Sequence, residues 1–193
     1  PVSLSSQPAT TVALKPNTPP VAPPGPPIYA RGMYGLGYRT WSAGIEDNLA
    51  VKIRAISPRI TCPPTVGYSE WRVIANDIAH LPISTKVVIF GHSMGANNLA
   101  LIANAVVPRP ISLLASYDAT WAYPRQPLSM NVMRVISIRG SNFFSFVGKA
   151  HQNFVPHFPM TRVQFISTND RHENVDDDNG FHFAVLNAIK QLP

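Results

Sequence analysis

Hydrophobic and polar positions change their periodicity repeatedly between residue 28 and the end of the chain. Short apolar runs predict strands at residues 28–31, 59–62, 86–90, 110–117, 131–139 and 162–167. Between them, apolar residues recur at the spacing of one buried helical face at residues 44–56, 69–81, 94–106 and 181–192. Strands that alternate with helices imply right-handed crossovers and a mostly parallel sheet. The expected fold is therefore a three-layer α/β/α sandwich.

The first 27 residues follow a different pattern, because they hold nine of the twenty prolines. Proline fixes φ and has no N–H, so this stretch predicts an extended, polyproline-like arm or linker. We therefore divide the chain into an arm at residues 1–27 and a folded domain at residues 28–193. The chain begins with Pro1, so a cleaved signal peptide or another trimming event is expected, and this favours a secreted or periplasmic protein over a cytoplasmic one.

The composition and charge of the chain limit the classes of protein to which it can belong. Of the 193 residues, 45% are hydrophobic and only 13% are charged, which excludes a disordered polyelectrolyte and a coiled coil. No apolar run approaches the roughly 20 residues of a membrane span, and the single Cys62 excludes an internal disulfide framework. Residues 1–168 hold 14 basic and 5 acidic residues. The resulting excess of positive charge allows an anionic membrane or cell-envelope surface as a partner. No sequence motif points to a nucleic acid as a partner.

The pentapeptide Gly91-His-Ser-Met-Gly95 is the most informative motif, because it fits G-x-S-x-G and stands between a predicted strand and a predicted helix. This setting is typical of a nucleophile elbow, a sharp turn that presents a serine hydroxyl above the end of a sheet. Glycines are needed on both sides because larger side chains would collide with neighbouring elements. We expect Ser93 to be a catalytic nucleophile. An ordinary glycine-rich turn is the alternative.

A serine nucleophile needs a general base, which is most often histidine. His172 follows the predicted strand 162–167 and precedes the last helix, so it stands on a loop at the carboxyl edge of the sheet and is the preferred base. His151 and His157 are weaker candidates for the base, and His182 ranks below them. His92 lies within the elbow and points the wrong way, and His80 ends a helix. Those six are all the histidines of the chain.

Asp118 is the preferred partner of this base. It ends the predicted strand 110–117, one βα unit from Ser93 on the same edge of the sheet. A solvated turn cap is the alternative role for Asp118. The rival acids are expected to form a turn and cap the last helix instead; they are Asp176, Asp177 and Asp178.

Two backbone N–H groups are expected to form an oxyanion hole. One belongs to Met94, directly after the nucleophile. The other is expected on the glycine-rich loop at residues 32–37, where Met33 is preferred. Glycines let such a loop approach a substrate closely. A plain flexible turn is the alternative.

Together these residues resemble the α/β-hydrolase fold, and in particular small lipase- or esterase-like bacterial serine hydrolases. The order Ser93, Asp118, His172 is the order of that family, and an acid 25 residues after the serine is similar to the arrangement in pancreatic-type lipases. A bacterial group within the fold shares further short segments. Here they are Arg31-Gly32, Ser42-Ala43-Gly44, Tyr117-Asp118-Ala119-Thr120, Asn131-Val132 and His172-Glu-Asn-Val-Asp176. Ala119 stands where that group often has proline, and the resemblance extends from Ile28 to the end of the chain.

The resemblance implies a carboxylic ester hydrolase that acts through an acyl-enzyme on a small-molecule or lipid ester. The 166 residues from Ile28 onward leave little sequence for a large lid. It implies no metal and no organic cofactor. Two segments are candidates for covering the site, at residues 121–130 and 141–160; the second holds five phenylalanines, which suit an acyl chain or satellite core packing. The alternatives are a lysis-type esterase of the cell envelope and a non-catalytic component of an assembly that keeps a hydrolase scaffold.

Overall fold

The computed structural model describes residues 25–36, 42–120, 127–140 and 161–193. Its middle layer is a seven-stranded sheet in the order β2-β1-β4-β5-β6-β7, with β3 beside β1. All pairings between these described strands are parallel. The strands are β1 (Ile28–Tyr34), β2 (Ile60–Thr61), β3 (Val66–Gly67), β4 (Lys86–His92), β5 (Leu113–Tyr117), β6 (Arg134–Arg139) and β7 (Arg162–Ser167).

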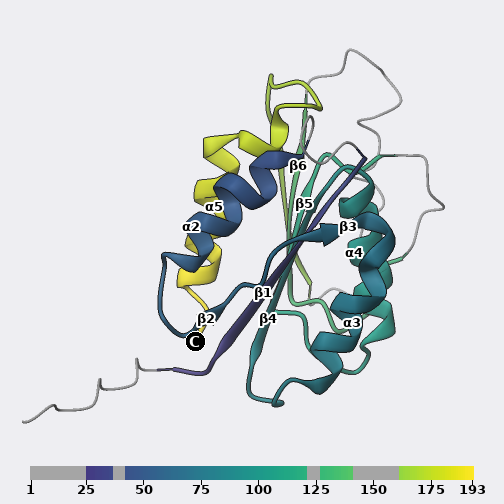
Figure 1. Ribbon diagram of the computed structural model, residues 1–193, viewed down its shortest axis with the longest axis vertical. Helices are drawn as coiled ribbons and strands as arrows, with labels where there is room; N and C mark the ends of the chain where they lie inside the picture. Colours follow the sequence, from purple (N-terminus) through teal and green to yellow (C-terminus); the bar gives the residue numbers. More distant parts are fainter. Residues whose placement is uncertain (1–24, 37–41, 121–126, 141–160) are drawn as a thin grey trace, which may run out of the picture.

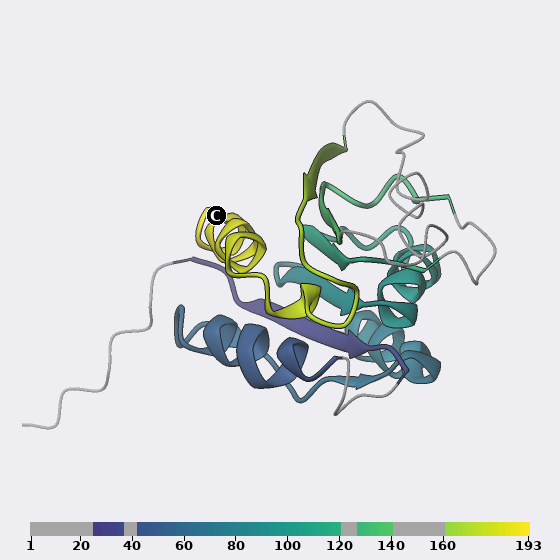
Figure 2. The ribbon, with the colours of Figure 1, turned by 90° about the horizontal axis from the view of Figure 1, so that it is seen from above.

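Helices cover both faces of the sheet, as Figure 1 and Figure 2 show, and this confirms the predicted three-layer sandwich. One face carries η1 (Ile45–Ala50), α2 (Val51–Arg54) and α5 (Asn179–Lys190), which follows the short η4 (Val175–Asp177). The other carries η2 (Tyr68–Glu70), α3 (Trp71–His80) and α4 (Met94–Ala105). In the described ranges, no helix has both the length and the apolar character that crossing a bilayer requires.

Each face of the sheet packs its own hydrophobic core against these helices. On β4, Val88 and Phe90 point into the core shared with η1 and α5, whereas Val87 and Ile89 point into the core shared with α3 and α4. All four side chains are fully buried. A strand covered on both faces needs such a continuous apolar run, and each buried side chain contributes about 1.5–3 kcal/mol. The run at residues 86–90 therefore places β4 at the centre of the sheet.

The first strand is longer than the sequence pattern predicts, because β1 continues to Tyr34. The pattern treats Gly32 as the residue that ends the strand. In the structure, a Cβ on Gly32 would lie 2.4 Å from the Phe90 ring and 2.5 Å from the Thr65 side chain, so this glycine permits close packing inside a continuing strand. The two-residue β3 has no counterpart among the predicted strands. Residues 1–24 of the predicted arm, 121–126 and the phenylalanine-rich segment 141–160 lie outside the described residues.

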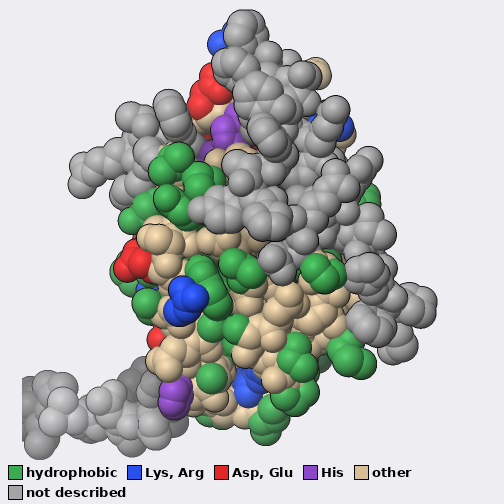
Figure 3. Space-filling view, turned by 90° about the vertical axis from the view of Figure 1, so that its right-hand side faces the viewer, with side chains coloured by type: hydrophobic (Ala, Val, Ile, Leu, Met, Phe, Trp, Pro, Cys, Tyr) green, Lys and Arg blue, Asp and Glu red, His purple; other side chains and the backbone are tan. Residues whose placement is uncertain are grey.

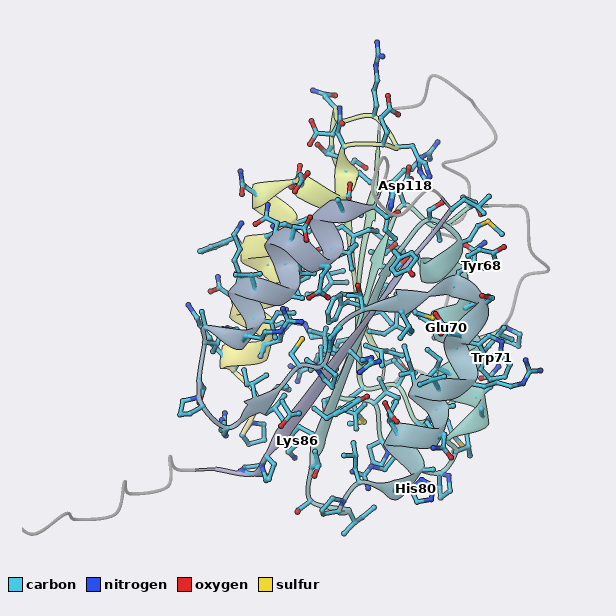
Figure 4. All side chains as sticks on the ribbon, in the orientation of Figure 1. Tyr68, Glu70, Trp71, His80, Lys86 and Asp118 are labelled. Carbon is cyan, nitrogen blue, oxygen red and sulfur yellow. The ribbon has the colours of Figure 1, made fainter. Side chains whose placement is uncertain are left out.

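Parallel pairing brings the carboxyl ends of the strands to one end of the molecule. In Figure 4, Asp118 lies at this end, just after β5, whereas Lys86, the first residue of β4, lies at the other end. Loops that follow β1, β4, β5 and β7 therefore become neighbours although they are far apart in the sequence. This edge of a parallel sheet is the usual location of ligand sites in open α/β folds.

Candidate active site

Ser93 lies in the turn between β4 and α4, with φ 57° and ψ −124°, a backbone conformation that non-glycine residues rarely adopt. The flanking glycines make the turn sterically feasible. A Cβ on Gly91 would lie 2.9 Å from the Gly95 backbone, and a Cβ on Gly95 would lie 2.7 Å from the carbonyl oxygen of Met33. Backbone strain of this kind persists where the surroundings enforce it and is concentrated at functional sites. The strand–turn–helix geometry of an elbow is thus present.

Three of the predicted site residues come together at the carboxyl end of the sheet. Ser93 Oγ lies 2.9 Å from His172 Nε2, and His172 Nδ1 lies 2.8 Å from Asp118 Oδ2. An ionised carboxylate only accepts hydrogen bonds, so Nδ1 carries the ring proton and the Nε2 lone pair faces the Ser93 hydroxyl. This arrangement can take the hydroxyl proton while the serine oxygen attacks an electrophile.

Asp118 is held firmly at the end of β5. Its side chain is 2% exposed, and its φ of 43° turns the backbone sharply after the strand. Its N–H donates to the Ile138 carbonyl at 2.9 Å, and its Oδ1 accepts the Gly140 N–H at 3.2 Å. Both carboxylate oxygens therefore have donors, which orients Oδ2 toward His172. The His172 side chain is 25% exposed, and Figure 3 shows histidine atoms at the surface near this end of the molecule.

The two expected oxyanion donors differ in their placement. Met94 is the first residue of α4, so its N–H is one of the helix-start donors that lack an intrahelical acceptor. Met33 lies inside β1, in register with Val66 of β3 and Gly91 of β4. Its amide therefore belongs to the sheet and not to the loop, contrary to the expectation, because β1 runs on past Gly32.

Among the described residues of this loop, Gly35 lies against Ser93. A Cβ on Gly35 would lie 2.7 Å from Ser93 Cβ and 3.0 Å from Ser93 Oγ, so a larger residue would displace the serine. The Gly35 N–H donates to Ser42 Oγ at 3.3 Å. The glycine-rich stretch at residues 32–37 is a signal for this contact in the sequence. The pattern could not single out Gly35, because the choice depends on where β1 ends.

The other histidines occupy different places. His182 lies on α5, is 1% exposed and donates from Nε2 to the Asp176 carbonyl at 2.7 Å. His80 is exposed at the end of α3, and His151 and His157 lie outside the described residues. His92 is fully buried, with its ring centroid 4.7 Å from that of His172. Within the described ranges, no cluster of three or more His, Cys, Asp and Glu side chains could hold a metal ion.

The rival acids form the turn before α5, as predicted. Asp178 caps the helix, because its Oδ1 accepts the Phe181 N–H at 2.7 Å. Asp176 is 1% exposed, and its Oδ2 accepts the Gly44 N–H at 2.9 Å. Burial, and to a lesser extent the nearby charge of Asp177, raises the pKa of Asp176 to about 7. Asp176 therefore bonds a neighbouring segment, while Asp118 bonds the ring of His172.

Comparisons with known proteins address the fold. No protein-family model matches the sequence, and a search of curated proteins finds no match. Among solved structures, Est1E from Butyrivibrio proteoclasticus matches with a TM-score of 0.59 at 11% identity, over 87% of this chain and 90% of that one. A lidless α/β serine hydrolase from Xanthomonas campestris matches with a TM-score of 0.53 at 16% identity, over 90% and 85%. A cutinase-like protein from Cryptococcus sp. matches with a TM-score of 0.52 at 13% identity, over 84% and 93%.

These similarities extend over most of each chain, but the sequence identities are low. They therefore establish the architecture and leave the chemistry to be argued from the site itself. The chain has the α/β-hydrolase fold, as the sequence motifs predict.

Proposed function

We propose that this chain is a serine hydrolase that cleaves carboxylic esters through an acyl-enzyme, with Ser93 as nucleophile, His172 as general base and acid, and Asp118 as orienting carboxylate. The observation that carries the proposal is the hydrogen-bonded path from Ser93 Oγ through the His172 ring to Asp118 Oδ2, with contacts of 2.9 and 2.8 Å. A nucleophile, base and acid bonded in this order suit acyl transfer. A serine hydrolase among the proteins of similar fold is in keeping with it.

The proposed reaction has two halves. Ser93 Oγ bonds to the ester carbonyl carbon while its proton passes to His172 Nε2, and the carbonyl oxygen becomes an oxyanion. When the oxyanion collapses, the bond to the leaving alkoxide breaks, and His172 gives the proton to that alkoxide. Water then attacks the acyl carbon and loses a proton to His172, and the second collapse releases the acid and returns the proton to Ser93 Oγ. Asp118 stabilises the imidazolium that forms in each half.

Backbone groups beside Ser93 are proposed to bind the oxyanion. The Met94 N–H is one donor, supported by its position at the start of α4, where the helix dipole favours negative charge. The loop at Gly35 is the proposed location of the second donor, since it contacts the serine directly. Each such donor typically contributes about 10²–10³ in rate.

The proposed substrates are small-molecule or lipid esters. Ser93 is 7% exposed and the His172 side chain is 25% exposed. The His172 ring thus retains some exposure, which is compatible with an ester group reaching the Ser93 hydroxyl.

The test combines covalent labelling with turnover. Wild-type protein should react with a fluorophosphonate probe at Ser93 and hydrolyse p-nitrophenyl acetate, because both reactions need the activated hydroxyl. Ser93→Ala should abolish labelling and lower kcat/KM by at least about 10³-fold, while Ser84→Ala, at an exposed serine, should match wild type. Labelling that maps to another residue, or a Ser93→Ala variant that keeps more than about a tenth of the activity, contradicts the proposal.

A further inference from the structure

His92, the residue directly before Ser93, touches the predicted base from the opposite side. Its side chain is fully buried, and its ring centroid lies 4.7 Å from that of His172. His92 Nε2 lies 2.9 Å from the backbone carbonyl oxygen of His172, and His92 Nδ1 lies 2.7 Å from Ser42 Oγ. The adjacent residues 92 and 93 therefore hold His172 at both ends, one at its backbone and the other at its ring.

The partners of His92 determine its tautomer. A carbonyl oxygen only accepts, so His92 Nε2 carries the proton and donates it to His172. The Nδ1 lone pair then accepts the Ser42 hydroxyl proton, and Ser42 Oγ in turn accepts the Gly35 N–H. Burial, with the neighbouring His172 as second cause, lowers the pKa of His92 to about 3. The ring is therefore neutral around neutral pH, as this set of hydrogen bonds requires.

We propose that His92 is a positioning residue for the proposed hydrolase: its Nε2–H fixes the backbone of His172, so that the ring of that residue stays in line between Asp118 and Ser93. Ser42 assists by orienting the His92 ring and by tying the Gly35 loop, which contacts the serine, to the same hydrogen-bond path. The inference rests on the proposed function, because positioning has meaning only if His172 transfers protons.

His182 provides a matched comparison within the same chain. It is as buried as His92, and its Nε2 also donates to a backbone carbonyl, that of Asp176, at 2.7 Å. That carbonyl belongs to the turn before α5 and not to a residue of the proposed triad. Loss of the His182 bond should therefore reduce stability without misplacing the base.

The experiment uses two replacements that preserve different halves of the imidazole. Glutamine places its amide nitrogen near the position of Nε2 and can still donate to the His172 carbonyl, whereas asparagine places its polar atoms near Nδ1 and falls short of that carbonyl. We expect His92→Asn to lower kcat for p-nitrophenyl acetate by about 10–100-fold with KM changed less than about threefold, since small misplacement of a catalytic group costs about this much. His92→Gln should recover most of kcat.

His182→Asn should lower the thermal midpoint as His92→Asn does and keep kcat within about threefold of wild type. The positioning role is wrong if His92→Asn keeps kcat within about threefold, or if His92→Gln loses as much as His92→Asn. Equal kcat losses in His92→Asn and His182→Asn also contradict it, because they point to lost stability alone.

A second readout separates this inference from the proposed function. Nitrogen chemical shifts of ¹⁵N-labelled histidine report the tautomer of the His172 ring without any turnover. The Nδ1–H tautomer should dominate in wild type, His92→Gln and His182→Asn, and should become averaged in His92→Asn. Absence of Ser93 labelling in wild type overturns the hydrolase proposal, whereas unchanged His172 shifts in His92→Asn overturn the positioning role.

Discussion

Replacement of Asp176 by asparagine should change how stability depends on pH, because the folded protein disfavours the ionised form of this carboxyl. Asp176 Oδ2 accepts the Gly44 N–H at 2.9 Å, while Oδ1 has no hydrogen-bond partner among the described residues. Burial, assisted by the charge of Asp177, raises the pKa of Asp176 from 3.8 to about 7. Asparagine has nearly the same shape, keeps an acceptor for Gly44 and does not titrate.

The sign follows from proton binding. Between pH 3.8 and about 7, the folded protein keeps the Asp176 proton while the unfolded chain has lost it, so the free energy of unfolding falls as pH rises. The stabilising contribution is complete below the unfolded pKa and is lost as pH passes through the folded pKa. Each pH unit in this window is worth about 1.4 kcal/mol. The interval of about three units therefore sets an upper bound of about 4 kcal/mol.

The assay is urea unfolding of wild type and Asp176→Asn, followed by circular dichroism from about pH 4.5 to about pH 8.5. The quantity of interest is the free energy of unfolding of wild type minus that of the variant, because groups common to both, including His92 and His182, cancel in this difference. We expect the difference to fall by about 2–3 kcal/mol over this range. A difference that stays constant or rises with pH refutes the reasoning that burial governs this carboxyl.

Two further predictions concern glycines that lie in close contact with neighbouring segments, Gly35 and Gly44. Gly35→Ala should slow both fluorophosphonate labelling and ester hydrolysis by at least about tenfold, because its Cβ would lie 2.7 Å from Ser93 Cβ. Gly67→Ala is the control, because its Cβ would lie 3.2 Å from the end of the Glu70 side chain and at an ordinary contact distance of 3.6 Å from the Tyr34 ring; equal rates for the two variants count against the Gly35 contact. Gly44→Ala should lower the free energy of unfolding by about 1–3 kcal/mol, since its Cβ would lie 2.9 Å from the Asp176 carbonyl oxygen; an unchanged urea midpoint would contradict this.

The sequence predicted those parts of the fold that depend on local pattern. The apolar run of β4 and the helical spacing of α4 flank the elbow as expected, because both depend on burial over consecutive residues. Ser93, Asp118 and His172 each follow a strand or precede a helix. A parallel sheet brings such positions to one edge, so their proximity could be inferred without coordinates. Their catalytic roles stay predictions until they are tested.

The features that the sequence could not predict depend on contacts between distant segments. Gly32 looks like the end of a strand, yet its absent side chain makes room for Phe90 and Thr65. For this reason Met33 was expected in a loop although it lies within the sheet. The two residues of β3 carry too little pattern to be recognised, since only their pairing with β1 defines them as a strand.

The segment Ser42-Ala43-Gly44 gains a physical role that its sequence resemblance alone did not provide. Ser42 orients His92, which donates a hydrogen bond to the backbone carbonyl of His172. The Gly44 N–H donates to the carboxyl of Asp176, which lies four residues after His172 in the sequence. Ser42 thus reaches the proposed base through His92, whereas Gly44 is bonded to the turn before α5. A Cβ on Gly44 would lie 2.5 Å from Asp177 Oδ1, so glycine there is a consequence of this close approach. The close spacing of serine and glycine therefore lets one short segment bond both His92 and Asp176, which are far apart in the sequence.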